Sequence, residues 1–130
     1  MKTSELVFDS WAWIEVLKGT PTGQRLWKHI QARRVVTPAF AVAEVARKMH
    51  REQGLAAADE FVAAARIRTT IQPLDDDIAA TAAQLLSHLR KRDAAASLAD
   101  ATMLATARRL GIPLVSRDPC FKGCADVRPE

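Results

Sequence analysis

Hydrophobic residues along this chain follow two spacings, and each spacing predicts one kind of element. Short apolar runs predict strands at residues 5–9, 33–37, 69–73 and 112–116, with 125–128 as a candidate edge strand. Apolar positions three or four residues apart predict helices at 11–17, 24–32, 39–51, 55–67, 75–92 and 97–110. The segment Gly19–Gly23 predicts a break between the first two helices. Strands that alternate with helices indicate an α/β fold with a mostly parallel sheet and helices on both faces.

The helix predicted at 39–51 has an apolar face and a charged face. The residues expected to be buried are Ala39, Val42, Ala43, Ala46 and Met49. Glu44 falls on the opposite side with Arg47 and Lys48, at the spacing of helical ion pairs on a solvated surface. Periodicity alone therefore gives Glu44 no functional role.

The helix predicted at 97–110 carries Asp100 near the middle of its apolar side. The residues that share this side are Ala99, Met103, Leu104, Ala107 and Leu110. A carboxylate that faces a core is costly unless it is paired or binds a cation. Ser97 lies three residues earlier, which also predicts a capping box in which Asp100 closes the helix N-terminus. The two roles are compatible.

Two further carboxylates follow predicted strands. Asp9 ends the first strand and Asp118 comes just after the fourth. Because parallel sheets bind ligands beyond the carboxyl ends of their strands, we expect both to converge with Asp100. Clustered carboxylates disfavour one another's charge unless a cation lies among them, and oxygen ligands alone select Mg²⁺ or Mn²⁺ over zinc. Phosphodiester hydrolysis is a reaction that such an ion supports.

Composition narrows the class of protein. With 130 residues, of which 48% are hydrophobic and 26% charged, the chain is expected to form a single domain over 1–130. No apolar run is long enough for a membrane span, and Met1–Glu5 leads straight into a strand, so we expect a cytoplasmic protein without a signal peptide. The net charge of +4, with Arg in excess of Lys, suits a polyanionic partner.

Other groups of reactive or charged residues have simpler explanations. Cys120 and Cys124 are too few for a disulfide scaffold or a zinc site, so free thiols are expected. The acids Asp75–Asp77 are expected to cap a helix rather than to bind metal.

Taken in order, several of these motifs resemble the pattern of PIN domains. They are Val7-Phe-Asp9-Ser10, Glu44 within Ala41–Val45, Asp100 within Leu98–Ala107, and Pro113–Asp118 followed by Phe121. The length and single-domain build are similar to those of VapC toxins from VapBC toxin–antitoxin pairs. The resemblance implies a three-layer α/β/α sandwich with a parallel sheet of about five strands, and a Mg²⁺- or Mn²⁺-dependent endoribonuclease.

The resemblance also implies roles for individual residues. Asp9, Glu44, Asp100 and Asp118 take the positions of the family's acidic quartet, which gives Glu44 a place in the site after all. Asp9 and Asp100 are the expected direct metal ligands. Glu44 and Asp118 are each expected to coordinate the metal, to hold a metal-bound water or to position the nucleophile, and Asp118 is counted among the metal ligands. The residues expected to support them are Ser10 and Ser116 beside the acids, and Arg117 as an RNA contact.

The same resemblance implies RNA as substrate, a cognate antitoxin as partner and a homodimer. Trp11 and Trp13 stand where smaller aliphatic residues are commoner in the family, and both are expected in the core. A non-catalytic RNA- or protein-binding module on a PIN fold remains the alternative. A phosphotransferase built on Asp9 is disfavoured because Trp11 replaces the second aspartate, and a receiver domain because the third strand ends at Pro73.

Overall fold

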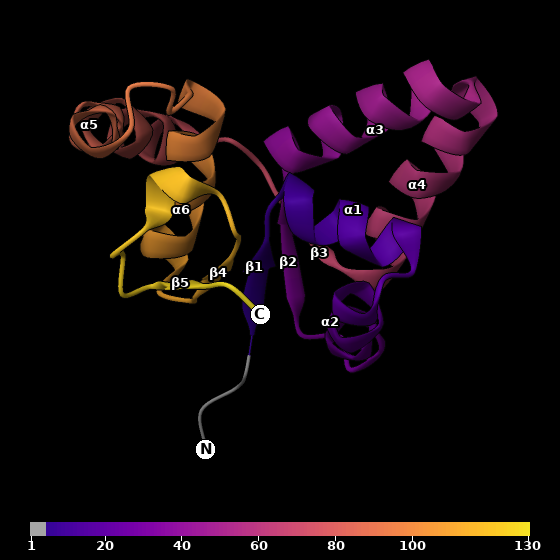
Figure 1. Cartoon of the computed structure of the whole chain (residues 1–130). Coiled ribbons are helices and arrows are strands. Elements are labelled where there is room, and N and C mark those ends of the chain that lie inside the picture. Colours follow the sequence, from indigo (N-terminus) through magenta and orange to yellow (C-terminus); the bar gives the residue numbers. More distant parts are fainter. Residues whose placement is uncertain (1–4) are drawn as a thin grey trace.

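The computed structural model describes residues 5–130 and contains five strands, six α-helices and one 3₁₀ helix over that range (Figure 1). In chain order these are β1 (Leu6–Phe8), α1 (Ser10–Lys18), α2 (Pro21–Gln31), β2 (Val35–Pro38), α3 (Ala39–Gln53), α4 (Leu55–Arg68), β3 (Thr70–Gln72), α5 (Asp76–Arg92), α6 (Leu98–Leu110), β4 (Leu114–Val115), η1 (Pro119–Phe121) and β5 (Val127–Arg128). The expectation that no signal peptide precedes the first strand depends on residues 1–4, which lie outside the described residues. Within residues 5–130, no helix is both long and apolar enough to cross a membrane.

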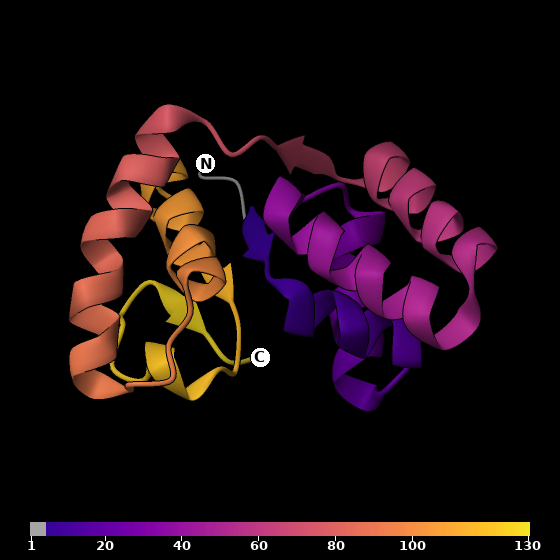
Figure 2. The same cartoon turned by 90° about the horizontal axis from the view of Figure 1, so that it is seen from above.

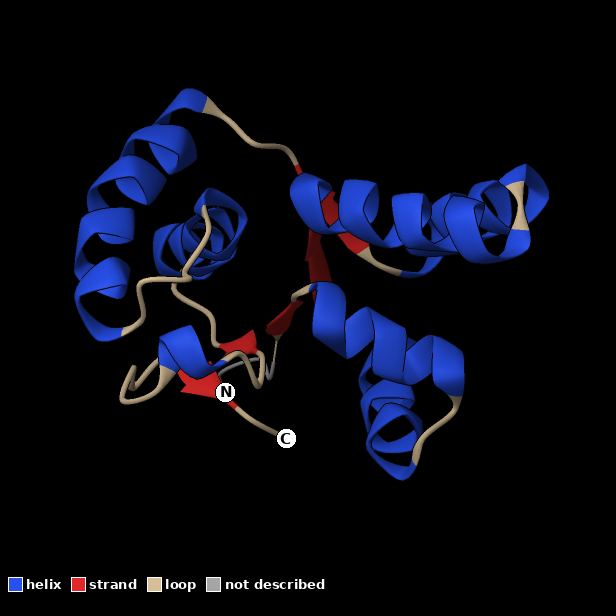
Figure 3. Cartoon of the chain, turned by 45° about the horizontal axis from the view of Figure 1, so that its top comes forward, coloured by secondary structure: helices blue, strands red, loops and turns tan. Residues whose placement is uncertain are grey.

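The sheet is entirely parallel, with the strand order β3-β2-β1-β4-β5. It lies at the centre of the molecule between two groups of helices (Figure 3). This confirms the predicted α/β fold. The order of strands along the chain reverses between β1 and β4, and in open parallel sheets such a reversal leaves a crevice beyond the carboxyl ends of the two strands.

Each face of the sheet is covered by its own hydrophobic core. Side chains alternate along β1, so Val7 packs with α5 and α6 on one face, whereas Leu6 and Phe8 pack with α1 to α4 on the other. Figures 1 and 2 show the two groups of helices on opposite sides of the strands. The arrangement is the three-layer sandwich that was expected.

Trp13 lies in the second of these cores, as predicted. It is 2% exposed, and its ring meets Phe8 and Phe61 edge to face. The indole Nε1–H donates to Thr37 Oγ1 at 3.0 Å, so its polar atom is satisfied inside the core. Trp13 thereby links α1 to β2 and α4.

Helix α2 begins earlier than the sequence predicted. It starts at Pro21 and contains Gly23, which had been assigned to a break between helices. Thr20 is the N-cap and accepts from Gly23 N at 2.9 Å, and a proline in the first turn costs no helical hydrogen bond. The predicted break is therefore confined to a short turn around Gly19.

The predicted buried faces of α3 and α6 were partly wrong. On α3 the fully buried residues are Ala41 and Val45, whereas Ala43 is exposed, because the helix packs against both α1 and α4. On α6, every residue from Ala101 to Ala107 is buried, including residues outside the predicted apolar side, and α5 packs against this helix. Leu110, expected in the core, is 39% exposed.

Candidate active site

Asp9 lies at the junction of β1 and α1, at the crevice where the strand order reverses. It is the N-cap of α1, and its Oδ1 accepts a hydrogen bond from Ala12 N at 2.9 Å. The side chain is held in a β-strand-to-helix turn and only 7% of the residue is exposed. Its position is thus fixed by the backbone of two elements.

Ser116 connects Asp9 to Asp118. It follows β4 directly, it is buried, and its hydroxyl is hydrogen bonded to the Asp9 carboxylate. Its Oγ also accepts from Asp118 N at 3.1 Å. Asp118 in turn caps η1, with Oδ1 accepting from Cys120 N at 2.9 Å. One buried serine therefore positions acids that are more than a hundred residues apart in the chain.

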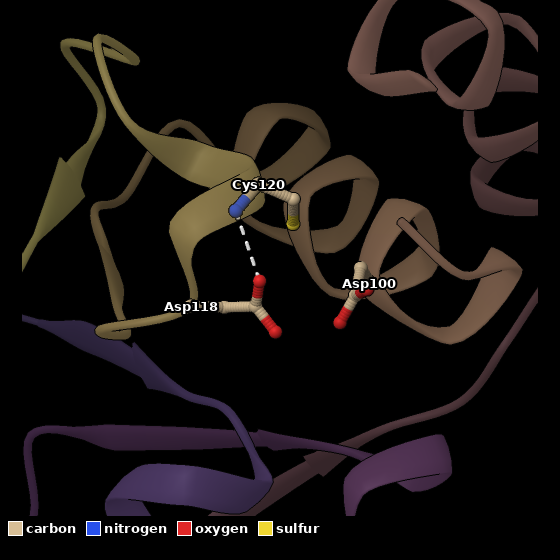
Figure 4. A group of neighbouring side chains, drawn as sticks. All are labelled: Asp100, Asp118 and Cys120. Atoms are coloured by element: carbon tan, nitrogen blue, oxygen red, sulfur yellow. Dashed lines mark hydrogen bonds between the residues drawn. The ribbon is translucent and has the colours of Figure 1, made fainter. Parts of the chain in front are cut away.

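Asp100 approaches from the N-terminus of α6. The predicted capping box is confirmed: Asp100 N donates to Ser97 Oγ at 3.0 Å, and Ser97 N donates to Asp100 Oδ2 at 2.8 Å. Figure 4 shows the Asp100 carboxylate pointing toward that of Asp118. Ligand atoms of Asp100, Asp118 and Cys120 all lie within 4.8 Å of one another, a spacing that could hold a metal ion.

Glu44 reaches the site from the opposite layer of helices. Its Oε1 accepts a hydrogen bond from the Ser10 hydroxyl, which begins α1. Glu44 is exposed, as periodicity predicted, but the expected pairing with Lys48 was wrong: Lys48 instead pairs with Glu52 at 2.5 Å. Glu44 is directed to the site because α3 starts at the carboxyl end of β2, beside β1.

All four predicted acids line one cleft of about 310 Å³. The remaining lining residues are Ser10, Trp11, Met103 and Arg117. The acids come from four different elements, and the sheet topology is what brings them together. Each of the two serines predicted to support the acids is hydrogen bonded to one of them.

The cleft disfavours negative charge while no cation is bound. Burial raises the pKa of Asp9 from its ordinary 3.8 to about 6, and the nearby Asp118 and Glu44 carboxylates raise it further, against the hydrogen bonds from Ser116 and Ala12. Burial and the hydrogen bond with Asp118 also raise the pKa of the Cys120 thiol well above its usual range. Burial is the main cause of both shifts, and the neighbouring carboxylates add to each of them.

The family of the chain is decided by a comparison of its sequence with protein-family profiles. The profile of the PIN domain matches residues 6–126. The chain belongs to the PIN domain family. No curated protein matches it significantly.

Solved structures agree with this assignment at the level of the fold. A toxin–antitoxin complex from Klebsiella pneumoniae superposes with a TM-score of 0.74 at 19% identity, covering 95% of this PIN domain and 96% of that chain. VapC20 of Mycobacterium tuberculosis, described as a sarcin-ricin loop cleaving toxin, gives 0.70 at 24% identity, covering 96% and 100%. DNA-bound VapBC from Salmonella typhimurium gives 0.77 at 15% identity, covering 97% and 96%.

The donor set of this PIN domain fits a hard divalent cation. Asp100 and Asp118 offer carboxylate oxygens close enough to share one ion, whereas Asp9 lines the same cleft but lies outside that close group. Carboxylate oxygens suit Mg²⁺ or Mn²⁺. The raised pKa of Asp9 fits the same interpretation, since a cation among the acids would favour their charged forms.

Besides Met103, which the sequence predicts only as a core residue, two residues have a place in the site that the sequence did not predict. Cys120 is fully buried beside Asp100 and Asp118, and its place two residues after Asp118, within the turn that this acid caps, is the signal that could have found it. Trp11, expected in the core, is only half-buried and lines the cleft. The Arg117 guanidinium lies 5.3 Å from the centre of its ring. The expectation of free thiols is confirmed for both cysteines.

Proposed function

We propose that this PIN domain is a Mg²⁺- or Mn²⁺-dependent endoribonuclease that acts as the toxin of a toxin–antitoxin pair. The observation that carries the proposal is the convergence of Asp9, Glu44, Asp100 and Asp118 on one cleft. The likeness to VapC and VapBC structures supports the class of substrate and the biological setting.

In the proposed mechanism, Asp9, Asp100 and Asp118 hold the cation. When bound, it lowers the pKa of a water molecule and offsets the charge that develops on the phosphate. Ser116 holds Asp9 and Asp118 in fixed positions relative to each other through its hydrogen bonds with the Asp9 carboxylate and with Asp118 N. Glu44, oriented by Ser10, accepts a proton from the attacking water. Arg117, which lines the cleft, contacts the RNA backbone in this proposal.

The test of the enzymatic part is cleavage of a structured RNA pool. We expect cleavage with Mn²⁺ that is abolished by EDTA and by Asp9→Asn or Asp100→Asn, with both variants still folded. Asp59→Asn, an exposed carboxylate on α4, is the matched control and should retain activity. If the wild type binds RNA and cleaves none with any divalent cation, the alternative of a non-catalytic binding module is correct.

The partners form the second part of the proposal. Several similar structures are complexes of toxins with antitoxins, which supports a cognate antitoxin that covers the cleft and stops cleavage. Co-expression with the product of the neighbouring reading frame tests this: we expect a stable complex without ribonuclease activity. We also propose a homodimer, to be checked by analytical ultracentrifugation of the purified chain.

A further inference from the structure

A second depression adjoins the catalytic cleft on its η1 side. It has a volume of about 430 Å³ and its lining is mostly apolar. Its apolar part is formed by Pro119, Phe121, Val127 and Pro129, and Arg117 and Lys122 add positive charge. We call this depression, defined by these six residues, the η1 groove. Its size is within the range of sites for small organic ligands.

The η1 groove is continuous with the cleft. Arg117 and Asp118 line both of them, so the two share a wall at the residue that is proposed to bind the metal. A phosphate held for cleavage at Asp118 would therefore have its neighbouring nucleotide at the entrance of the groove. Because the groove opens into the cleft where cleavage would take place, a segment of the RNA substrate is the ligand that we expect in it.

The charges around the groove suit a nucleic acid. Arg117 and Lys122 are cationic, and the acid at its border, Asp118, belongs to the proposed metal site. Arg117 is fixed in place: its Nε donates to the Pro129 carbonyl at 2.6 Å, and Nη2 donates to that of Glu130 at 3.1 Å. A guanidinium has five N–H donors, so these two bonds do not exhaust its capacity to bind phosphate.

We propose that the η1 groove binds the base of an unpaired nucleotide next to the scissile phosphate, while Arg117 and Lys122 contact the backbone. This proposal rests on the proposed ribonuclease function. An apolar groove of limited size discriminates bases by shape and by contact with their faces. The groove would then give the enzyme a nucleotide preference at one position beside the cut.

Cys124 provides a reporter inside the groove. It is half-buried and lines both the groove and a second depression formed by α5 and α6, whereas Cys120 is fully buried. The loop that carries Cys124 is tied to α5, since Arg92 Nη1 donates to Lys122 O at 3.2 Å and to Cys124 Sγ at 3.4 Å. A ligand in the groove should therefore shield one thiol in a well-positioned loop.

The first experiment measures alkylation of Cys124 by iodoacetamide, followed by mass spectrometry, in EDTA and with the full chain. The probes are the four ribonucleoside 5′-monophosphates, with ribose 5-phosphate as the control that lacks a base. We expect at least one nucleotide to slow alkylation several-fold and ribose 5-phosphate to leave it unchanged. Lys122→Glu should weaken this protection, whereas Lys91→Glu, an exposed charge reversal on α5 outside the groove, should not.

Two results of this experiment would overturn the proposal. One is that no nucleotide protects Cys124 from alkylation. If a cognate antitoxin protects Cys124 and nucleotides do not, the groove is a protein-binding surface and the proposal is likewise wrong. The other is equal protection by ribose 5-phosphate, which would reduce the groove to a phosphate site. Since no metal or cleavage is needed, the result stands even if the proposed ribonuclease function fails.

The second experiment maps cleavage sites on a randomised RNA. Val127→Phe, or Pro129→Trp if the first variant is unstable, should change the preferred nucleotide at one position beside the cut. Ile67→Trp, an exposed site on α4, is the matched control. An unchanged preference in a folded, active groove variant contradicts the proposal.

Discussion

The Ser10 hydroxyl donates a hydrogen bond to the Glu44 carboxylate and so joins the first residue of α1 to α3. The two residues are 34 positions apart in the chain. Ser10 follows Asp9 directly, so this bond fixes the carboxylate of Glu44 relative to the most buried acid of the cleft.

We predict that Ser10→Ala lowers RNA cleavage by about 10–100-fold, because loss of a residue that orients a catalytic carboxylate costs about this much. The measurement is the rate of cleavage at saturating Mn²⁺. Ser87→Ala, an exposed serine on α5, is the control and should leave the rate unchanged. A rate for Ser10→Ala equal to that of the wild type would mean that Glu44 needs no orientation by Ser10.

Asp100 has two separable roles: it caps the N-terminus of α6, and it belongs to the cluster of acids. We predict that Asp100→Asn lowers the rate of RNA cleavage by more than about 100-fold. Its free energy of unfolding should stay within about 1 kcal/mol of the wild-type value, because an amide oxygen can still accept the hydrogen bond from Ser97 N. Ser97→Ala should do the reverse, with about 1 kcal/mol less stability and a smaller loss of rate. Urea unfolding and cleavage assays on the same preparations test both halves. A large fall in stability for Asp100→Asn would contradict this separation.

The raised pKa of Asp9 predicts how stability depends on pH in EDTA. The Asp9 carboxyl binds its proton more tightly in the folded protein than in the unfolded chain. The free energy of unfolding therefore falls as pH rises from about 4 to about 6, and above that range the loss is complete. A rise from 3.8 to about 6 corresponds to about 3 kcal/mol. Asp9→Asn should therefore be more stable than the wild type at pH 7, and the difference should disappear near pH 4.

The measurement is thermal unfolding of both proteins across this pH range without metal. Excess Mg²⁺ or Mn²⁺ at pH 7 should stabilise the wild type and leave Asp9→Asn less affected, because the carboxylate then gains a counter-charge. A constant difference between wild type and Asp9→Asn from pH 4 to pH 7 would show that Asp9 ionises normally.

Gly23 marks a close approach between helices that periodicity does not reveal. A Cβ at this position would lie 1.9 Å from the Glu15 carbonyl oxygen, so the α1–α2 pair requires glycine here. We predict that Gly23→Ala costs about 3 kcal/mol of stability or more, measured by urea unfolding. Lys28→Ala, on the exposed side of α2, should change stability by less than about 0.5 kcal/mol. A Gly23→Ala variant as stable as the wild type would mean that the helices can separate without cost.

Much of the fold could be predicted because strands and helices alternate and because capping residues and glycines mark where many of them begin and end. The runs around Val7, Val36 and Leu114 are buried on both sides of a parallel sheet, so their apolar character does not depend on orientation. Ser97 and Gly111 correctly predicted where α6 begins and ends, and Asp75 is the N-cap of α5, as predicted. These are local signals, and each is confirmed.

What could not be predicted depends on which surfaces meet in space. Alanine fits both a core and a surface, so an alanine-rich helix such as α3 gives little indication of the face that packs, and Ala43 was misplaced. The contact of Glu44 with Ser10 depends on the position of β2 beside β1, which helical periodicity does not contain. Cys120 was overlooked because its neighbourhood is built by a turn that begins at Asp118.

The central position of β1, between β2 and β4, has a consequence for synthesis of the chain. Asp9 and Glu44 emerge from the ribosome well before Asp100 and Asp118. A nascent polypeptide that stops before β4 has no complete set of carboxylates, and one edge of β1 is still unpaired. Under the proposed ribonuclease function, the nascent chain therefore lacks a complete site for cleavage until its last strands dock.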